Sequence, residues 1–192
     1  MKFARAMVLV AAAVLAVVAT ITIAGQLDRL AGMTESPTTT APPPLDPGDP
    51  VRVTIPAIGV DAPLVPVGLR TDGAMETPDF GHAAWYRPGP RPGEPGPAVL
   101  VAHVDASERG PDVFFRLRDL RPGDQVSVHY ADALRTFTVT DTEQVAKATL
   151  PTDRIWPATT DPVLRLITCG GAFDRAAGSY LDNVIVYADR LG

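Results

Sequence analysis

The pattern of apolar and polar positions after residue 50 predicts a domain made mostly of β-strands. Apolar and polar residues alternate, as in strands with one buried face, in three segments: 51–55, 125–130 and 136–140. Short runs rich in β-branched residues, typical of buried strands, occupy 99–102, 164–168 and 183–187. Gly and Pro turns separate the segments, and only 113–120 and 152–155 favour short helical turns. Many short strands with frequent turns predict a closed or nearly closed β-barrel.

The N-terminal part of the chain predicts a single membrane anchor. Residues 6–25 are apolar and uncharged, and about 20 such residues match the hydrocarbon thickness of a bilayer. Lys2 and Arg5 make residues 1–5 a basic flank, which is expected to stay in the cytoplasm. The alternative is a cleaved signal peptide, but its apolar region is usually shorter, about 7–15 residues. An uncleaved anchor with the remaining chain outside the cell is therefore the favoured interpretation.

A spacer is expected between this anchor and the folded domain. Residues 26–50 are rich in Pro and Thr towards their C-terminal end, a composition typical of an extended, semi-rigid segment without a packed core. Residues 51–192 remain, enough for one domain with its own core. The net charge of −5 and the lack of any Lys/Arg cluster argue against binding to nucleic acid.

Cys169 is the only cysteine, so it cannot form an intrachain disulfide. It comes directly after the buried strand predicted at 164–168 and before Gly170 and Gly171, which we expect to form an open loop. A lone cysteine is often a packing residue. In an exported domain without disulfides, however, retention of one thiol favours a chemical role.

His103 is a candidate partner for this thiol because it follows the buried strand predicted at 99–102. If the two strands are neighbours, both side chains project at the same rim of the barrel. Acyl transfer through sulfur needs an acid/base, which His103 can supply, and donors for the oxyanion, such as the N–H groups of Gly170 and Gly171. Asp105 either orients the imidazole or, as the favoured reading, forms a turn.

Several motifs together resemble those of the sortase family. They are Leu-Ile-Thr-Cys at 166–169, Ala-His-Val-Asp at 102–105, and the membrane anchor with its spacer. The longer run 166–188 and the opening segment 51–64 resemble the class F branch of high-GC Gram-positive bacteria. The similarity extends over 51–188, essentially the whole domain.

The resemblance implies a closed eight-stranded β-barrel and a cysteine transpeptidase. Such an enzyme cleaves sorting signals of the Leu-Pro-x-Thr-Gly kind, holds the acyl half as a thioester, and transfers it to an amine of the cell wall or of a pilin, or to water. Cys169 would then be the nucleophile and His103 the general acid/base.

Sortases also use an arginine after the cysteine, and its identity is open in this chain. In many relatives it lies near 181–183, where this sequence reads Leu-Asp-Asn. Arg175 is the favoured substitute. Arg165 is the alternative, although four residues of strand would put it about 13 Å from Cys169.

No cofactor or required metal is expected, since the acidic residues lack the spacing of a calcium loop. Two other classes remain possible. One is a different exported cysteine peptidase or wall transpeptidase, although the Ser-x-Gly-Cys-x-Arg run of the peptidoglycan cross-linking type is absent. The other is a surface-displayed β-barrel that binds without catalysis.

Overall fold

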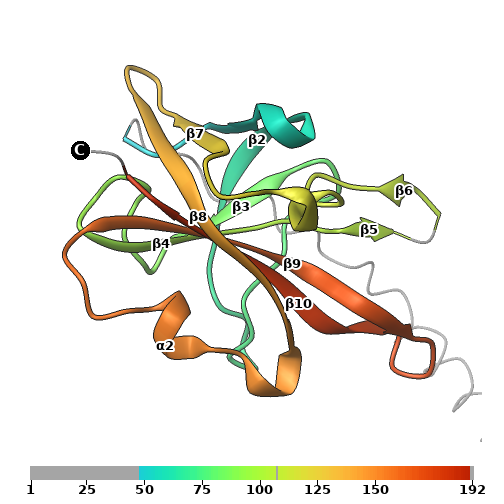
Figure 1. The fold of residues 1–192 in the computed structure, drawn as a ribbon. Coiled ribbons are helices and arrows are strands. Elements are labelled where there is room, and N and C mark those ends of the chain that lie inside the picture. Colours follow the sequence, from blue (N-terminus) through green and yellow to red (C-terminus); the bar gives the residue numbers. More distant parts are fainter. Residues whose placement is uncertain (1–47, 107, 191–192) are drawn as a thin grey trace, which may run out of the picture. The chain divides into compact units, whose positions relative to one another are not determined.

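A computed structural model of the chain describes residues 48–106 and 108–190 (Figure 1). The predicted cytoplasmic flank, the membrane anchor and most of the spacer lie outside this part of the chain. Within the described residues, no helix is both long enough and apolar enough to span a bilayer.

The described residues form ten strands and a few short helical turns. The strands are β1 (Arg52–Ile55), β2 (Val60–Val67), β3 (Ala83–Tyr86), β4 (Gly96–Val101), β5 (Asp105–Ala106), β6 (Gly110–Pro111), β7 (Gln125–His129), β8 (Leu134–Ala146), β9 (Pro162–Asp174) and β10 (Ser179–Asp189). The helical elements are three 3₁₀ turns, η1 (Pro56–Ile58), η2 (Leu117–Asp119) and η3 (Lys147–Thr149), and the one-turn helix α2 (Thr152–Ile155).

Eight of the strands close into a barrel in the order β1-β2-β3-β4-β9-β10-β8-β7, with β7 pairing back to β1. Most neighbours are antiparallel, but β2 with β3 and β4 with β9 are parallel. The closed eight-stranded barrel with short helical turns confirms the expected fold class. The short strands β5 and β6 form a separate ribbon next to the barrel (Figure 1).

Apolar side chains pack on both sides of the wall formed by β4, β9 and β10. Leu100, Leu166 and Val186 belong to the central core, where side chains that alternate along each strand meet. On the opposite face of the same strands, a smaller cluster contains Val99, Ile185 and Tyr187, joined by Ile155 of α2. The wall is therefore buried on both faces over part of its length, which explains the continuous apolar runs in its sequence.

The expected strand boundaries needed two corrections. β2 and β3 were not expected, because Gly59 and the nearby prolines indicate turns in the sequence. Gly59 does turn the chain, with φ 72°, but β2 begins at the next residue. β9 does not end at Cys169 but continues through Gly170 and Gly171 to Asp174. The open Gly-Gly loop expected there is wrong, because both glycines lie in a long hairpin with β10.

The end of the predicted spacer packs against the barrel. Asp49 and Pro50 are both buried, and the Asp49 carboxylate accepts hydrogen bonds from Nε and Nη2 of Arg91 at 3.1 and 3.0 Å. A buried carboxylate needs such a partner to offset the loss of its hydration. The folded part therefore includes residues that composition alone assigns to the spacer.

Candidate active site

The register between β4 and β9 brings His103 next to Cys169. The two strands are parallel, and their last registered pair is Val101 with Ile167. His103 and Cys169 each come two residues later, so they continue the same row across the wall. Because side chains alternate along a strand, both lie on the face shared with Val101 and Ile167. These two residues pack in the smaller cluster that contains Val99 and Tyr187, and not in the central core.

A buried hydrogen bond joins the residues that precede the two candidates. The Thr168 hydroxyl donates to the carbonyl oxygen of Ala102 at 2.8 Å, and Thr168 is only 5 % exposed. A buried hydroxyl without a partner would cost free energy. This hydrogen bond therefore holds the ends of the two segments side by side, at the point where the regular pairing of β4 with β9 ends. The threonine of Leu-Ile-Thr-Cys thus has a structural role in aligning the pair.

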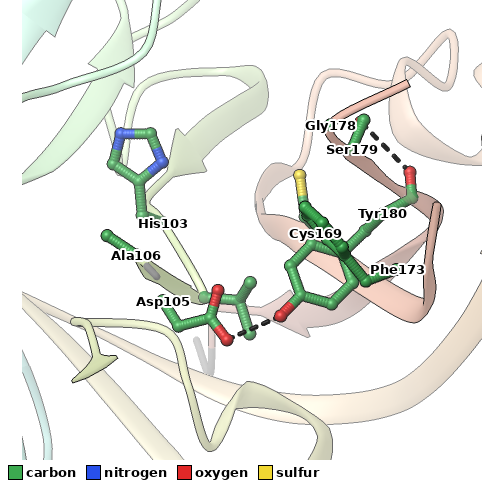
Figure 2. A pocket seen from close by; sticks show the side chains of 9 residues that line it. His103, Asp105, Ala106, Cys169, Phe173, Gly178, Ser179 and Tyr180 are labelled. Carbon is green, nitrogen blue, oxygen red and sulfur yellow. Dashed lines mark hydrogen bonds between the residues drawn. The ribbon is translucent and has the colours of Figure 1, made fainter. Parts of the chain in front are cut away.

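His103 and Cys169 stand on opposite sides of one pocket of about 420 Å³ (Figure 2). Residues 103–106 form one wall, and the other consists of Cys169, Phe173 and residues 178–180 of the β9–β10 hairpin. Cys169 is a free thiol and only partly buried, so its sulfur can be reached from this pocket. The volume falls in the range typical of sites for small ligands.

The orientation of the His103 ring is set by the loop between β2 and β3. Its Nε2 lies 2.9 Å from the carbonyl oxygen of Pro78. A carbonyl can only accept, so Nε2 carries the proton and Nδ1 of the neutral ring has the free lone pair. Figure 2 shows one ring nitrogen turned towards the side of the pocket where Cys169 lies. The neutral imidazole can thus accept a proton there.

Asp105 neither orients the imidazole nor forms a simple turn, which departs from both readings of the sequence. It begins β5, and its Oδ2 accepts a hydrogen bond from the hydroxyl of Tyr180 at 2.6 Å. This hydrogen bond raises the pKa of Tyr180, and burial adds to the effect. The Tyr180 ring also packs edge-on against Phe173, with ring centres 5.1 Å apart. The bond joins the two walls of the pocket below His103 and Cys169 (Figure 2).

Gly170 and Gly171 do not line this pocket. A Cβ at Gly170 would lie 2.8 Å from Cγ2 of Val184, so glycine is needed there for close packing of β10. Gly171 has φ 76° and lies against the Asp182 side chain, near the point where the register of the two strands shifts. Both positions thus have packing and backbone reasons to be glycine, and their expected role as oxyanion donors stays a prediction.

The two candidate arginines have different surroundings, and neither lines the pocket. Arg165 is only 7 % exposed, donates to the carbonyls of Leu164 and Arg154, and lies over the Tyr187 ring with 4.9 Å from Cζ to the ring centre. Burial lowers the pKa of its guanidinium. Arg175 lies in the exposed turn between β9 and β10 and makes no hydrogen bond or ion pair with a described residue. Only Arg175 is available to a ligand on the hairpin.

The remaining histidines lie elsewhere. His129 of β7 is hydrogen-bonded through Nε2 to the Thr54 hydroxyl at 2.9 Å, and His82 lies in the loop before β3. Among the described residues, no group of three His, Cys, Asp or Glu side chains is arranged to hold a metal ion.

A comparison with known families identifies the family of this chain. A family model of the sortase domain matches residues 53–191, which include all eight barrel strands apart from the first residue of β1. The chain belongs to the sortase family.

Solved structures similar to this sortase share its fold. Sortase C-1 of Streptococcus pneumoniae is 21% identical, with a TM-score of 0.58 over 74% of this chain and 66% of that one. Sortase C-1 of Actinomyces oris is 22% identical, with a TM-score of 0.57 over 75% and 76%. Sortase A of Listeria monocytogenes is 18% identical, with a TM-score of 0.56 over 76% and 88%. No curated protein sequence matches this sortase significantly.

Three features of the candidate active site were missed from the sequence. They are the Pro78 carbonyl on His103, the Thr168 bond to Ala102, and the Tyr180 bond to Asp105. Each joins residues at least 25 positions apart, and none of these residue types is unusual where it stands. No local pattern in the sequence signals them.

Proposed function

We propose that this sortase is a cysteine transpeptidase in which Cys169 is the nucleophile and His103 the general acid/base. The observation that carries the proposal is the parallel register of β4 and β9, which sets the thiol and the imidazole at one pocket. A thiol reaches useful nucleophilicity when a base takes its proton, and a histidine is the residue best suited to that task near neutral pH.

In the proposed first step, Nδ1 of His103 takes the thiol proton and Sγ of Cys169 attacks the carbonyl carbon of the scissile peptide bond. The tetrahedral intermediate collapses as the C–N bond breaks, and His103 returns its proton to the leaving amine. The acyl half remains as a thioester on Cys169. The Pro78 carbonyl supports both halves of this cycle, because its hydrogen bond to Nε2 leaves Nδ1 free and also stabilises the imidazolium.

The donor in this proposal is a sorting signal of the Leu-Pro-x-Thr-Gly kind, and the acceptor is an amine of the cell wall or of a pilin, or water. The class F assignment rests on the run 166–188.

We also propose that residues 6–25 anchor the enzyme in the membrane, with the N-terminal flank in the cytoplasm and the catalytic domain outside the cell.

Arg175 is the arginine we propose for contact with the substrate carbonyl. Its exposed position in the hairpin turn supports this choice, since Arg165 already donates to the backbone carbonyls of Arg154 and Leu164. Among relatives the arginine lies near Leu181, and Leu181 is 53 % exposed here with no charge to offer. In this proposal Arg175 approaches the pocket from the hairpin turn, and not from the position near Leu181.

The test is incubation of the protein with Leu-Pro-x-Thr-Gly peptides, followed by mass spectrometry of the protein itself. We expect an acyl adduct on Cys169 and no turnover by Cys169→Ala, while His103→Ala lowers kcat/KM by about 10²–10⁴. Asp132→Asn, on an exposed turn, is a control of unchanged activity. Peptide binding without any adduct, equal for the wild type and Cys169→Ala, would instead support the non-catalytic binding module.

A further inference from the structure

The pocket contains one carboxylate, and the His103 imidazole is the one basic side chain among its lining residues. Its nine lining residues include Asp105 but neither Lys nor Arg. Asp105 is half-buried, and its Oδ2 is held by the Tyr180 hydroxyl. Its Oδ1 accepts no hydrogen bond from the described residues, and Figure 2 shows this oxygen turned into the pocket. A fixed negative charge therefore faces the space between the imidazole and the thiol.

The Tyr180 hydroxyl holds this charge in place without neutralising it. The Tyr180 ring is itself oriented by its edge-on contact with Phe173, with an interplanar angle of 73°. One Asp105 oxygen is thus bound through a rigid aromatic side chain, and the other remains available as an acceptor. A preoriented acceptor loses little entropy when a ligand donates to it, which favours a specific contact over a diffuse attraction.

We propose that Asp105, positioned by Tyr180, binds the ammonium group of the amine acceptor. This inference rests on the proposed transpeptidase function, in which the second substrate is a primary amine. At neutral pH such an amine is mostly protonated, since α-amino groups have a pKa near 7.7–8.0 and lysine side chains near 10.4. A carboxylate beside the base that must deprotonate the amine matches this charge, and charge-assisted hydrogen bonds are among the stronger ones.

In the proposed transfer step, the ammonium bound to Asp105 gives one proton to Nδ1 of His103, which releases it to water. The nitrogen lone pair then attacks the thioester carbon, a C–N bond forms, and the carbonyl π electrons move to oxygen. The C–S bond breaks with its electron pair leaving on Sγ, while His103 moves a second proton from nitrogen to sulfur. A thioester and an ammonium ion thus yield an amide, the free thiol and one proton, without any change of oxidation state.

The experiment compares charged and uncharged acceptors on the same acyl-enzyme. The full-length protein in detergent is acylated with a Leu-Pro-x-Thr-Gly peptide at neutral pH and offered triglycine amide, Nα-acetyl-lysine amide or hydroxylamine, of which the last is mostly uncharged. The two amines distinguish an α-ammonium from a side-chain ammonium as the natural ligand. The amide, hydroxamate and hydrolysis products are measured by mass spectrometry.

For Asp105→Asn we expect the ratio of kcat/KM for the better amine to that for hydroxylamine to fall about tenfold or more, as loss of a charge-assisted hydrogen bond predicts. The change should lie mainly in KM for the amine, and hydrolysis should take a larger share of the product. Asp105→Glu should recover part of the ratio because it keeps the charge, and Asp132→Asn should leave it unchanged. Tyr180→Phe should lower the ratio less than Asp105→Asn does. In the double variant that carries both changes, the ratio should equal that of Asp105→Asn alone.

The result that overturns the inference is an equal loss for amines and hydroxylamine in Asp105→Asn, or no loss for either. An equal loss would mean that Asp105 only joins the two walls of the pocket. The proposed function fails separately, and the inference with it, if no peptide forms an acyl adduct on Cys169 in the wild type.

Discussion

Gly170→Ala tests whether close packing explains the glycine after Cys169. The new Cβ would lie 2.8 Å from Cγ2 of Val184, whereas carbon atoms in contact prefer about 3.5–4.0 Å. Val184 is 3 % exposed and part of the central core, so it has little room to move away. Overpacking of this kind costs about 1–3 kcal/mol. Replacing Gly by Ala returns about 0.4–1 kcal/mol by restricting the unfolded chain, so we expect a net loss of about 1–2 kcal/mol.

Val184→Ala provides the matched partner for this test. Alone it should cost about 1–3 kcal/mol, because it removes two buried methyl groups and leaves a small cavity. In the double variant the methyl group introduced at position 170 occupies part of the space that Val184 leaves. We therefore expect the double variant to be more stable, by about 1 kcal/mol or more, than the sum of the two single effects predicts.

The measurement is urea unfolding of the four proteins, followed by tryptophan fluorescence, to which Trp85 contributes from the barrel core, where it is 2 % exposed. The coupling energy comes from the double-mutant cycle. If the two losses add to within about 0.5 kcal/mol, the two residues do not interact as described and the packing explanation of Gly170 is wrong.

Two further predictions concern the arginines and the histidine. Arg165→Ala should lower the free energy of unfolding by about 2–4 kcal/mol, because it leaves two carbonyls without their charged donor and removes the contact with Tyr187. Arg175→Ala should change the free energy of unfolding by less than about 0.5 kcal/mol but should lower kcat/KM. The opposite pattern in urea unfolding and peptide cleavage would exchange their roles. Long-range ¹H–¹⁵N spectra above the pKa of histidine should show His103 protonated at Nε2, as the Pro78 carbonyl requires; protonation at Nδ1 would contradict the proposed base.

Six of the eight barrel strands, and both short helical segments, could be predicted from the sequence. Segments such as 125–130 and 183–187 can be recognised as strands because burial imposes an alternation or clustering of apolar residues on the local sequence. β2 and β3 could not be recognised in this way, since prolines and small residues interrupt them and their parallel pairing depends on a long connection. The extension of β9 past Cys169 was missed because two glycines usually indicate a turn.

The candidate site was only partly determined by the sequence. Cys169 and His103 stand out because each follows a segment that the sequence predicts to be a buried strand, and the chain has one cysteine and three histidines. Their meeting at one pocket depends on β4 and β9 being parallel neighbours in this register, which no local pattern contains. The burial of Arg165 and the bond from Tyr180 to Asp105 are likewise products of the closed barrel. Burial leaves a periodic trace in the sequence, whereas register and contacts between distant strands depend on how the whole barrel packs, and only the tertiary structure contains them.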